Sequence, residues 1–365
     1  MFFIERIDGQ EIPPELREPW NQLSGGIPFR RWEWLANWWK YYGKPHELYV
    51  LVARDERGTI RGIAPWFQRR SMTGGRVVEP LGSGKVSTDY LSLLCSEGDA
   101  PHVADAFAEW LNAANGSNSQ GRRDAWDLLH LPAVVEGDPA ITELAGRLSA
   151  RGCRAHHREG MRTWRVTLPD NWEAYVSMLS KPGRRQARKA TRRLSEPNAF
   201  DFHEASDLES LQKGFEILID LHQRRWESVG IEGCFTDERF TSFLKAASEE
   251  LFAARMVQLN WVSYQGKPIV INFELYSDGV EYVYQGGMDP DARMLCPGWI
   301  QMAILHQRAI ARGRKYRDYL RGDEPYKKHW RGGPTQLIDW RIVPSHTAAR
   351  LRHGVWMLGD SLKHW

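Results

Sequence analysis

Apolar side chains recur at intervals of three and four residues in many parts of the chain, which is the spacing of one helix face. Trp34, Trp38 and Tyr41, for example, share one face of a short aromatic helix that Gly43 closes. With their flanking Gly, Pro and Asp residues, these repeats predict helices over 30–43, 101–114, 138–152, 171–179, 208–230, 237–255 and 299–312.

Shorter segments that alternate in polarity, or are apolar throughout, predict strands over 47–53, 59–70, 87–95, 125–131, 256–264, 268–276, 280–287 and 315–322. Two strand pairs joined by a Gly-containing turn predict hairpins, and their likeness suggests a duplicated unit. In one of them, Ile271 and Phe273 face one way while Asn272 and Glu274 face the other. The order of elements is not a strict alternation of strand and helix. We therefore predict an α/β fold of the α+β type with mixed sheets.

Length and composition narrow the class of protein. A chain of 365 residues favours two domains, and a hydrophobic fraction of 42% favours real cores. The net charge of +3 gives no general argument for nucleic acid. The 17 Trp residues can serve cores, binding clefts or membrane-interface contacts. The four Cys residues lie far apart, so we predict neither a metal site nor a disulfide framework.

The expected cellular compartment is inferred from two kinds of segment that the sequence does not contain. The first ten residues have no basic region followed by an apolar run, so we expect no signal peptide. No segment approaches the roughly 20 apolar residues of a spanning helix. We expect a cytoplasmic protein with reduced thiols, which at most lies on a membrane surface.

A dense run of positive charge follows Ser180. If 180–194 is helical, its cations form two adjacent rows along the helix. A solvated face is one interpretation; the others are binding of cofactor phosphates, a charged glycan, a lipid headgroup or an RNA backbone. No aromatic residue interrupts the run, which disfavours stacking of single-stranded bases. The cations are Lys181, Arg184, Arg185, Arg188, Lys189, Arg192 and Arg193, of which we select Arg184 and Arg185 as substrate-binding candidates.

A glycine pair ends the predicted strand 280–287, and a helix begins soon afterwards. Gly286 and Gly287 let the chain leave the strand, and Pro297 suits a first helical turn. Gly298 has no side chain to obstruct the helix start, and Arg293 adds positive charge nearby. The free N–H groups of such a helix start can bind an anion. An ordinary helix cap is the alternative interpretation.

Segment 316–330, with the sequence YRDYLRGDEPYKKHW, combines charges of both signs with four aromatic rings. It is too polar for a core strand and too aromatic for a plain loop. Together with YVYQGGMDPDARMLCPGWIQ before it, and with PFRRWEWLANWWKYYG and GIAPWFQRR in the first half, it resembles the CelD-type GNAT-like acyltransferases, which are related to FemAB-like proteins. The resemblance covers about residues 25–340. It implies two tandem GNAT-like units linked to cellulose and exopolysaccharide biosynthesis.

The resemblance implies transfer of an acyl group, acetyl from acetyl-CoA or another acyl-CoA, to an amine or hydroxyl. The CoA pyrophosphate then maps onto Gly286, Gly287, Arg293, Pro297 and Gly298. Two departures concern this donor site. Neither half has the Gln/Arg-x-x-Gly-x-Gly/Ala loop, and Cys stands at position 296, where the family leads us to expect Ser. A metal is not implied.

Under this hypothesis segment 316–330 lines a cleft between the units. The chemistry needs a base and groups that hold developing charge. An ion-pair network between the units is the structural alternative, and His222 and Arg225 are weaker candidates because a helix-surface His is more often structural. The candidate bases are Asp318, Asp323 and Glu324; the candidate binding groups are Arg321, Tyr326, Lys327 and Trp330.

The tail carries apolar residues at alternating four- and three-residue spacing: Leu351, Val355, Leu358, Leu362 and Trp365. With nearby Arg and Lys residues this predicts an amphipathic basic helix, which either packs on its own domain or lies on a membrane. We thus predict an N-terminal unit, 1–160, as scaffold or acceptor side. A donor and catalytic unit, 161–345, and the tail helix, 346–365, follow it.

Three functions remain open at this point. The first is acyl transfer to a sugar nucleotide or polysaccharide precursor, in contact with polysaccharide-synthesis machinery. The second is FemAB-like transfer of an aminoacyl group from tRNA, the one case in which nucleic acid is a partner. The third is a non-catalytic GNAT-like module that binds a glycan or a synthase.

Overall fold

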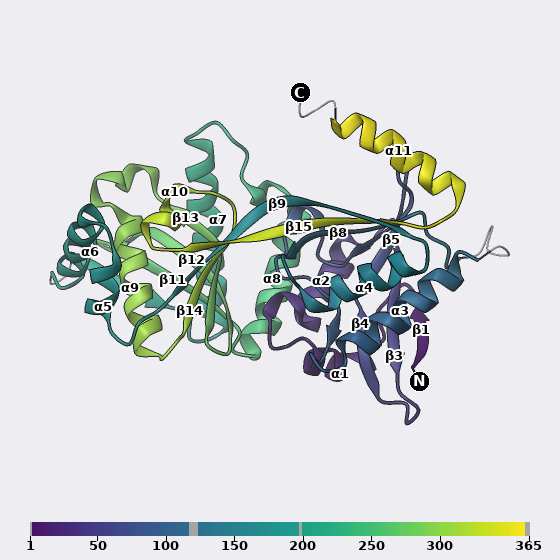
Figure 1. Cartoon of the computed structure of the whole chain (residues 1–365). Coiled ribbons are helices and arrows are strands. Elements are labelled where there is room, and N and C mark those ends of the chain that lie inside the picture. Colours follow the sequence, from purple (N-terminus) through teal and green to yellow (C-terminus); the bar gives the residue numbers. More distant parts are fainter. Residues whose placement is uncertain (1, 117–122, 197–198, 362–365) are drawn as a thin grey trace. The chain divides into compact units, whose positions relative to one another are not determined.

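The computed structural model describes residues 2–116, 123–196 and 199–361, and Figure 1 shows their helices and strands. The chain forms two compact units. The first contains Met1–Met161 and Gln336–Trp365, and the second contains Arg162–Thr335. The chain therefore returns to the first unit at Gln336, and residues 336–345 belong to that unit instead of the second.

The strands of the first unit fall into two groups. One is an antiparallel sheet in the order β1 (Phe3–Ile7), β3 (Val50–Arg54), β4 (Ile60–Ala64), β7 (Leu94–Cys95). The other has the order β15 (Gly333–Val343), β8 (Leu128–Val135), β6 (Gly75–Pro80), β5 (Trp66–Ser71), β2 (Glu47–Leu48). Among the described strands of this unit, β6 and β8 pair in parallel, with Val77 opposite Leu128 and Val78 opposite Leu129.

Helices α3 (Ala100–Ala114) and α4 (Pro139–Ala150) pack together, and α3 also covers β1, β3 and β4. A Cβ added at Gly62 would lie 2.3 Å from Val103, so glycine permits the close approach of β4 to α3. The core includes Trp66, Phe107 and Trp126, all at most 1% exposed. The remaining helices of the unit are α1 (Arg17–Leu23), α2 (Trp32–Tyr42) and α11 (Thr347–Ser361), with 3₁₀ turns at Pro14–Leu16, Pro28–Arg30 and Gly84–Val86.

Three strand predictions in the first unit are wrong in extent. The strand predicted over 47–53 is β2 and β3, which belong to different sheets. The strand predicted over 59–70 is two strands in different sheets, because Pro65 has no N–H to donate to a ladder. Of the strand predicted over 87–95 only β7 forms. Ser87 and Tyr90 have left-handed φ values of 51° and 62°, which interrupt an extended chain.

The second unit has strands in the order β10 (Phe200–Glu204), β11 (Val257–Tyr264), β12 (Lys267–Ser277), β13 (Val280–Met288), β14 (Tyr316–Arg321), β9 (Arg154–Thr167). All neighbours are antiparallel except β13 and β14. The predicted hairpin of β11 and β12 is confirmed. Both faces of β12 are buried, however, and the predicted polar face holds Glu274 at 0% exposure.

Helices cover both faces of these strands. On one face α7 (Leu208–Glu227) contacts β11, β12 and β13, and α8 (Glu238–Ala253) contacts β11. On the other face α9 (Pro297–Ala311) packs beneath α6 (Lys181–Leu194) and α5 (Trp172–Met178), as Figure 1 shows. Short helices Cys234–Thr236, Pro290–Leu295 and α10 (Pro325–His329) complete the unit. Segment 180–194 is thus helical, with the Ser180 side chain accepting from Gly183 N–H at its start.

The two units repeat one order of elements. Each runs through two helices, antiparallel strands, a crossover helix and a strand parallel to the one before it: β6–α3–β8 in the first unit and β13–α9–β14 in the second. A helical crossover is the usual way to join parallel strands. The predicted α/β fold with mixed sheets and a duplicated unit is confirmed.

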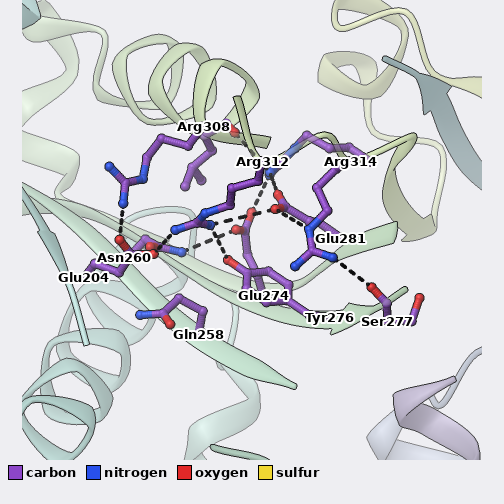
Figure 2. A network of polar contacts seen from close by, with 12 residues as sticks. Glu204, Gln258, Asn260, Glu274, Tyr276, Ser277, Glu281, Arg308, Arg312 and Arg314 are labelled. Atoms are coloured by element: carbon purple, nitrogen blue, oxygen red, sulfur yellow. Dashed lines mark hydrogen bonds and ion pairs between the residues drawn. The ribbon is translucent and has the colours of Figure 1, made fainter. Parts of the chain in front are cut away.

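A buried charge cluster joins the strands of the second unit, and Figure 2 shows its glutamates from close by. Arg317 on β14 bonds to Glu281 on β13 at 2.5 Å and to Glu274 on β12. All three side chains are at most 1% exposed. Arg317 also donates to the carbonyl of Leu305 in α9 at 3.5 Å. One guanidinium therefore ties three strands to a helix.

Further arginines surround this cluster (Figure 2). Arg312 and Arg314 lie 3.9 and 3.6 Å from Oε1 of Glu281. Glu204 on β10 bonds Arg308 of α9 and Arg312, which directly follows that helix. Breaking one partner of such a buried pair leaves an uncompensated charge and is strongly destabilising.

The cluster makes the stability of the second unit depend on pH. Burial, opposed by Arg317 and helped by Glu274, raises the pKa of Glu281 from 4.5 to about 7. A carboxyl with a raised folded pKa stabilises the fold fully below the unfolded pKa, and the effect is lost as pH rises through the folded pKa. We expect the free energy of unfolding to fall by on the order of 1–3 kcal/mol between pH 5 and pH 8.

Chemical denaturation at several pH values, followed by Trp fluorescence, measures this fall. Glu281→Gln keeps an acceptor for Arg317 but cannot titrate, so it should flatten the dependence. Glu196→Gln, an exposed acid of the same unit, should leave it unchanged. Equal slopes for Glu281→Gln and the unaltered protein would contradict the assignment.

Candidate functional site

The parallel strands β13 and β14 pair over three residues and then part. Val280–Tyr282 pair with Tyr316–Asp318, whereas β13 continues to Met288 with β12 and β14 continues to Arg321 with β9. Both strands carry a register shift beyond the paired part. Ligands of α/β sheets commonly bind outside the carboxyl ends of parallel strands.

The start of α9 lies at these strand ends. Cys296 precedes the helix with a left-handed φ of 54° and gives no side-chain cap. Pro297 is buried, and a Cβ added at Gly298 would meet nothing within 4 Å. The position of Gly298 is therefore open to an approaching group, as a helix start that binds an anion requires.

The glycine pair before this helix has a packing reason. A Cβ at Gly287 would lie 2.6 Å from the backbone nitrogen of His222, so β13 and α7 meet too closely for any side chain. At Gly286 the added Cβ would lie 3.1 Å from the carbonyl oxygen of Ile271. Their role as cofactor-binding residues stays a prediction beside this structural one.

The C-terminal end of α7 is bound to the segment that follows β13. Arg224 bonds Asp289 at 2.6 Å and Asp291 at 3.4 Å. Arg293 is exposed and donates to Ser228 Oγ at 3.5 Å. These contacts hold the loop between β13 and α9 and leave the Arg293 guanidinium at the surface.

Asp318 shapes the strand β14 at the point of divergence. Its side chain is fully buried and accepts from the N–H of Leu320 at 2.8 Å and from Arg165 Nε at 2.8 Å. Thr163 Oγ1 lies 3.2 Å away. Leu320 takes a left-handed φ of 57°, which these bonds stabilise. A carboxylate with this many partners positions the backbone.

The buried side chain of Lys327 holds together the loop that follows β14. Its ammonium, 2% exposed, donates to the carbonyls of Leu320, Arg321 and Gly322 at 3.0, 2.6 and 3.1 Å, and pairs with Glu324 at 2.8 Å. These four partners occupy the buried ammonium. We therefore assign Lys327 a role in positioning the loop. Arg321 takes part in this arrangement through its carbonyl oxygen, which accepts from Lys327.

The acidic candidates of this loop are more accessible. Asp323 accepts from Trp164 Nε1 at 3.2 Å, and the Glu324 side chain is 55% exposed. Gly322 has a φ of 109°, and a Cβ there would lie 2.5 Å from the Glu324 carboxylate. Glycine at this position thus permits the tight turn that presents Glu324.

Tyr326 lies among charges from two elements. Burial raises the pKa of its phenol, the Glu324 carboxylate raises it further, and the Arg225 guanidinium of α7 opposes them. The phenol therefore stays protonated at neutral pH, although the residue is 36% exposed. Arg225 and Glu324, which the sequence analysis selected separately, thus both act electrostatically on the Tyr326 phenol.

Other selected residues lie in the core. Trp330 is 3% exposed and stacks on His306, with ring centroids 4.8 Å apart. His222 is 3% exposed, accepts from Trp226 Nε1 at 2.9 Å, and burial lowers its pKa to about 4. Both have the contacts of structural residues, which is the alternative considered for His222.

Helix α6 carries exposed cations, as the sequence predicts. Arg184 donates to the carbonyl of Leu179 at 2.8 Å, and Arg193 bonds the carbonyl of Leu295 just before α9. Their partners are within the fold. The cations turned to solvent are Lys181, Arg185, Arg188, Lys189 and Arg192.

The sequence analysis missed the buried polar groups that support this site. His306 Nε2 lies 2.8 Å from the Tyr319 hydroxyl, and the Tyr175 hydroxyl donates to the carbonyl of Trp330 at 2.6 Å. No local pattern marks these residues, because their partners come from distant segments. Arg317 carried no signal either, because Lys315 and Arg321 recur on the same strand face.

Comparison with known proteins identifies the domain. Residues 181–328 match the family model described as "Acetyltransferase (GNAT) domain". The matched segment lies within the second unit, Arg162–Thr335. This agrees with the resemblance found in the sequence at the level of GNAT-like proteins. No curated protein sequence matches the chain.

Solved structures share the whole fold. FemX is similar at a TM-score of 0.66 and 11% identity, over 95% of this chain and 99% of that one. A conserved protein of unknown function from Bacteroides thetaiotaomicron has a TM-score of 0.56 and 12% identity, over 93% and 100%. L-PGS from Bacillus licheniformis has a TM-score of 0.53 and 13% identity, over 93% and 94%. At these identities the likeness concerns the fold alone, and it extends over both units of the chain.

Two searches of the described residues gave no result. No group of three or more His, Cys, Asp or Glu side chains there is arranged to hold a metal ion. No described helix is long and apolar enough to cross a membrane.

The two glycines that flank the loop give a matched test of the GNAT-domain geometry. We expect Gly287→Ala to lower the free energy of unfolding by about 1–3 kcal/mol, because β13 and α7 must move apart. Gly298→Ala has open space and should cost nothing measurable. Denaturant unfolding of both variants measures the difference. Equal effects would contradict the close approach at Gly287.

Proposed function

We propose that the chain is an acyltransferase that takes an acyl group, acetyl first among candidates, from a CoA thioester at the diverging ends of β13 and β14. The three-residue ladder carries this proposal. Beyond it two strand edges separate, and an extended arm containing amides can pair with such an edge as a strand does. The pantetheine arm of CoA has this form.

The surroundings of the GNAT domain support the same donor. A pyrophosphate suits the start of α9, where Gly298 leaves room and Arg293 is exposed. The first unit is less suited to the donor, because the segment after β6 is long and packs into the fold. Its residues Leu81, Val86 and Leu93 are exposed by 2% or less. We therefore propose the second unit as the donor side and the first as scaffold or acceptor side.

We propose that Glu324 accepts a proton from the acceptor amine or hydroxyl as its nitrogen or oxygen attacks the thioester carbonyl. The tetrahedral intermediate then breaks the carbon–sulfur bond and releases CoA thiolate. Tyr326, which burial keeps protonated, donates a proton to that sulfur. The products are the acylated acceptor and CoA with its thiol restored.

The resemblance to CelD-type proteins supports a sugar nucleotide or polysaccharide precursor as acceptor. Arg225 and Arg321 are the candidate contacts for its anionic groups. The same resemblance supports the proposal that the protein acts in the cytoplasm, in contact with polysaccharide-synthesis machinery.

A second candidate function rests on the exposed face of α6. Five cations without an acidic partner in the described contacts run along this helix. A phosphate backbone suits such a row. This favours FemAB-like transfer of an aminoacyl group from tRNA.

Binding separates the two donors. We expect acetyl-CoA to bind in isothermal titration, and Arg293→Ala to weaken it about tenfold by removing one phosphate contact. Gly298→Glu should abolish binding by placing a carboxylate at the helix start.

Two controls match these variants. Arg70→Ala removes an exposed cation of the first unit, and Gly146→Glu adds a carboxylate at another open helical glycine. Both should bind normally. No binding by acetyl-CoA, longer acyl-CoAs or free CoA sinks the CoA proposal. RNA binding that weakens steeply with salt, and is lost when the α6 cations are reversed, would then establish the second function.

Turnover tests the roles of the loop. Once an acceptor is found, Glu324→Gln and Tyr326→Phe should each lower kcat by about 100-fold or more, with little change in KM. Asp323→Asn should retain most activity, because its carboxylate is outside the proposed proton path. Near-normal kcat in both Glu324→Gln and Tyr326→Phe, with folding unchanged, would refute this assignment.

A further inference from the structure

The strand β12 carries a buried amide, Asn272, in its middle. The residue is 9% exposed, and among the residues that the structure describes no hydrogen bond reaches its side chain. Buried polar side chains are nearly always hydrogen-bonded, and Asn is depleted from strands. Its flanking residues Ile271 and Phe273 are apolar and fully buried. Neither packing nor strand propensity therefore explains an amide at this position.

The amide lies on the face of the sheet that α9 covers. Asn272 is opposite Gly286 of β13, and opposite residues of an antiparallel pair share a face. The next residue, Gly287, faces α7, because a Cβ there would strike the α7 backbone. Successive residues of a strand point to opposite faces, so Gly286 and Asn272 face away from α7. On that side α9 contacts β12 and β13.

The Asn272 amide leans toward β13. Its Oδ1 would lie 3.4 Å from a Cβ built on Gly286, and its Cγ 3.9 Å. The other direction offers a partner, because Asn260 of β11 is also opposite Asn272. Asn260 Oδ1 is buried and accepts no hydrogen bond from the described residues. An amide with a purely structural role would donate to this oxygen instead of lying over a glycine.

The place toward which the amide leans is the free part of β13. The parallel ladder with β14 ends at Tyr282, and Gly286 comes four residues later. Beyond the ladder this strand has no β14 neighbour in the described structure. This is the strand edge along which we place the pantetheine arm. That arm contains two amides, whose N–H groups suit an acceptor such as Asn272 Oδ1.

We infer that Asn272 is a donor-binding residue, whose Oδ1 accepts a hydrogen bond from an amide N–H of the pantetheine arm beside Gly286. The inference rests on the proposed use of a CoA thioester. It also gives Gly286 a second role, because the missing side chain leaves room for both the amide and the arm. The free protein carries an amide without a partner, and donor binding supplies that partner.

Two substitutions in the full chain test this role by isothermal titration. Asn272→Leu replaces the amide by an apolar group of similar size, and Asn272→Ala removes it without adding bulk. Each should weaken acetyl-CoA and free CoA by the same factor, about five- to tenfold, because both ligands carry the arm. Since the amide has no partner in the free protein, Asn272→Leu should leave the denaturant midpoint unchanged or raise it.

Asn37→Leu is the matched control. Asn37 is a buried amide of the first unit, 6% exposed, whose Nδ2 donates to the carbonyl of Glu33 at 2.8 Å. The substitution breaks this hydrogen bond and should lower the denaturant midpoint without changing the affinity for CoA. The two Leu variants should thus show opposite patterns of stability and binding.

The other outcomes overturn the inference in distinguishable ways. Normal CoA affinity in both Asn272 variants removes the inference and leaves the proposed acyltransferase standing. A weakened affinity accompanied by a lower denaturant midpoint in Asn272→Leu assigns the amide a structural role instead. If the unaltered protein binds neither acetyl-CoA nor free CoA, the proposed function fails, and the inference fails with it.

Discussion

The hydrogen bond from Arg317 to Glu281 holds together β13 and β14, the parallel pair among the described strands of the second unit. These two residues lie opposite each other in the three-residue ladder of β13 and β14, and Glu274 on β12 accepts from the same guanidinium. Because all three groups are buried, the charges cannot separate without a large desolvation cost. The strands are therefore joined firmly at one end and free to part at the other.

The proposed chemistry depends on that asymmetry. Beyond the ladder, Asp318 fixes the irregular backbone of β14, and Lys327 binds three successive carbonyls where the strand ends. Gly287 allows α7 to approach β13. Rigid, buried groups thus carry a loop whose Glu324 side chain is accessible. This division suits a site that must be preorganised and still admit two substrates.

Local pattern was sufficient for much of the fold. The helices and the hairpins followed from periodicity and turn residues, and the pattern of segment 286–313 gave the α9 start correctly. The errors have local causes: Pro65 divides one predicted strand, and left-handed residues at Ser87 and Tyr90 break another. Of the candidate residues, Lys327 and Trp330 were selected for charge and aromaticity, but both are buried by partners that composition does not reveal.

The sequence by itself determined most of the helices, the two hairpins, the mixed α/β class, the duplicated order and the resemblance to GNAT-like acyltransferases, because each depends on neighbours along the chain. Tertiary structure alone decided which charges are buried, where the parallel strands part, and that Arg225 and Glu324 both act on the Tyr326 phenol. It also decided that the apolar side of α11, with Leu351, Val355 and Leu358, faces outward. These features depend on pairings between residues far apart in sequence, whose energies no local pattern records.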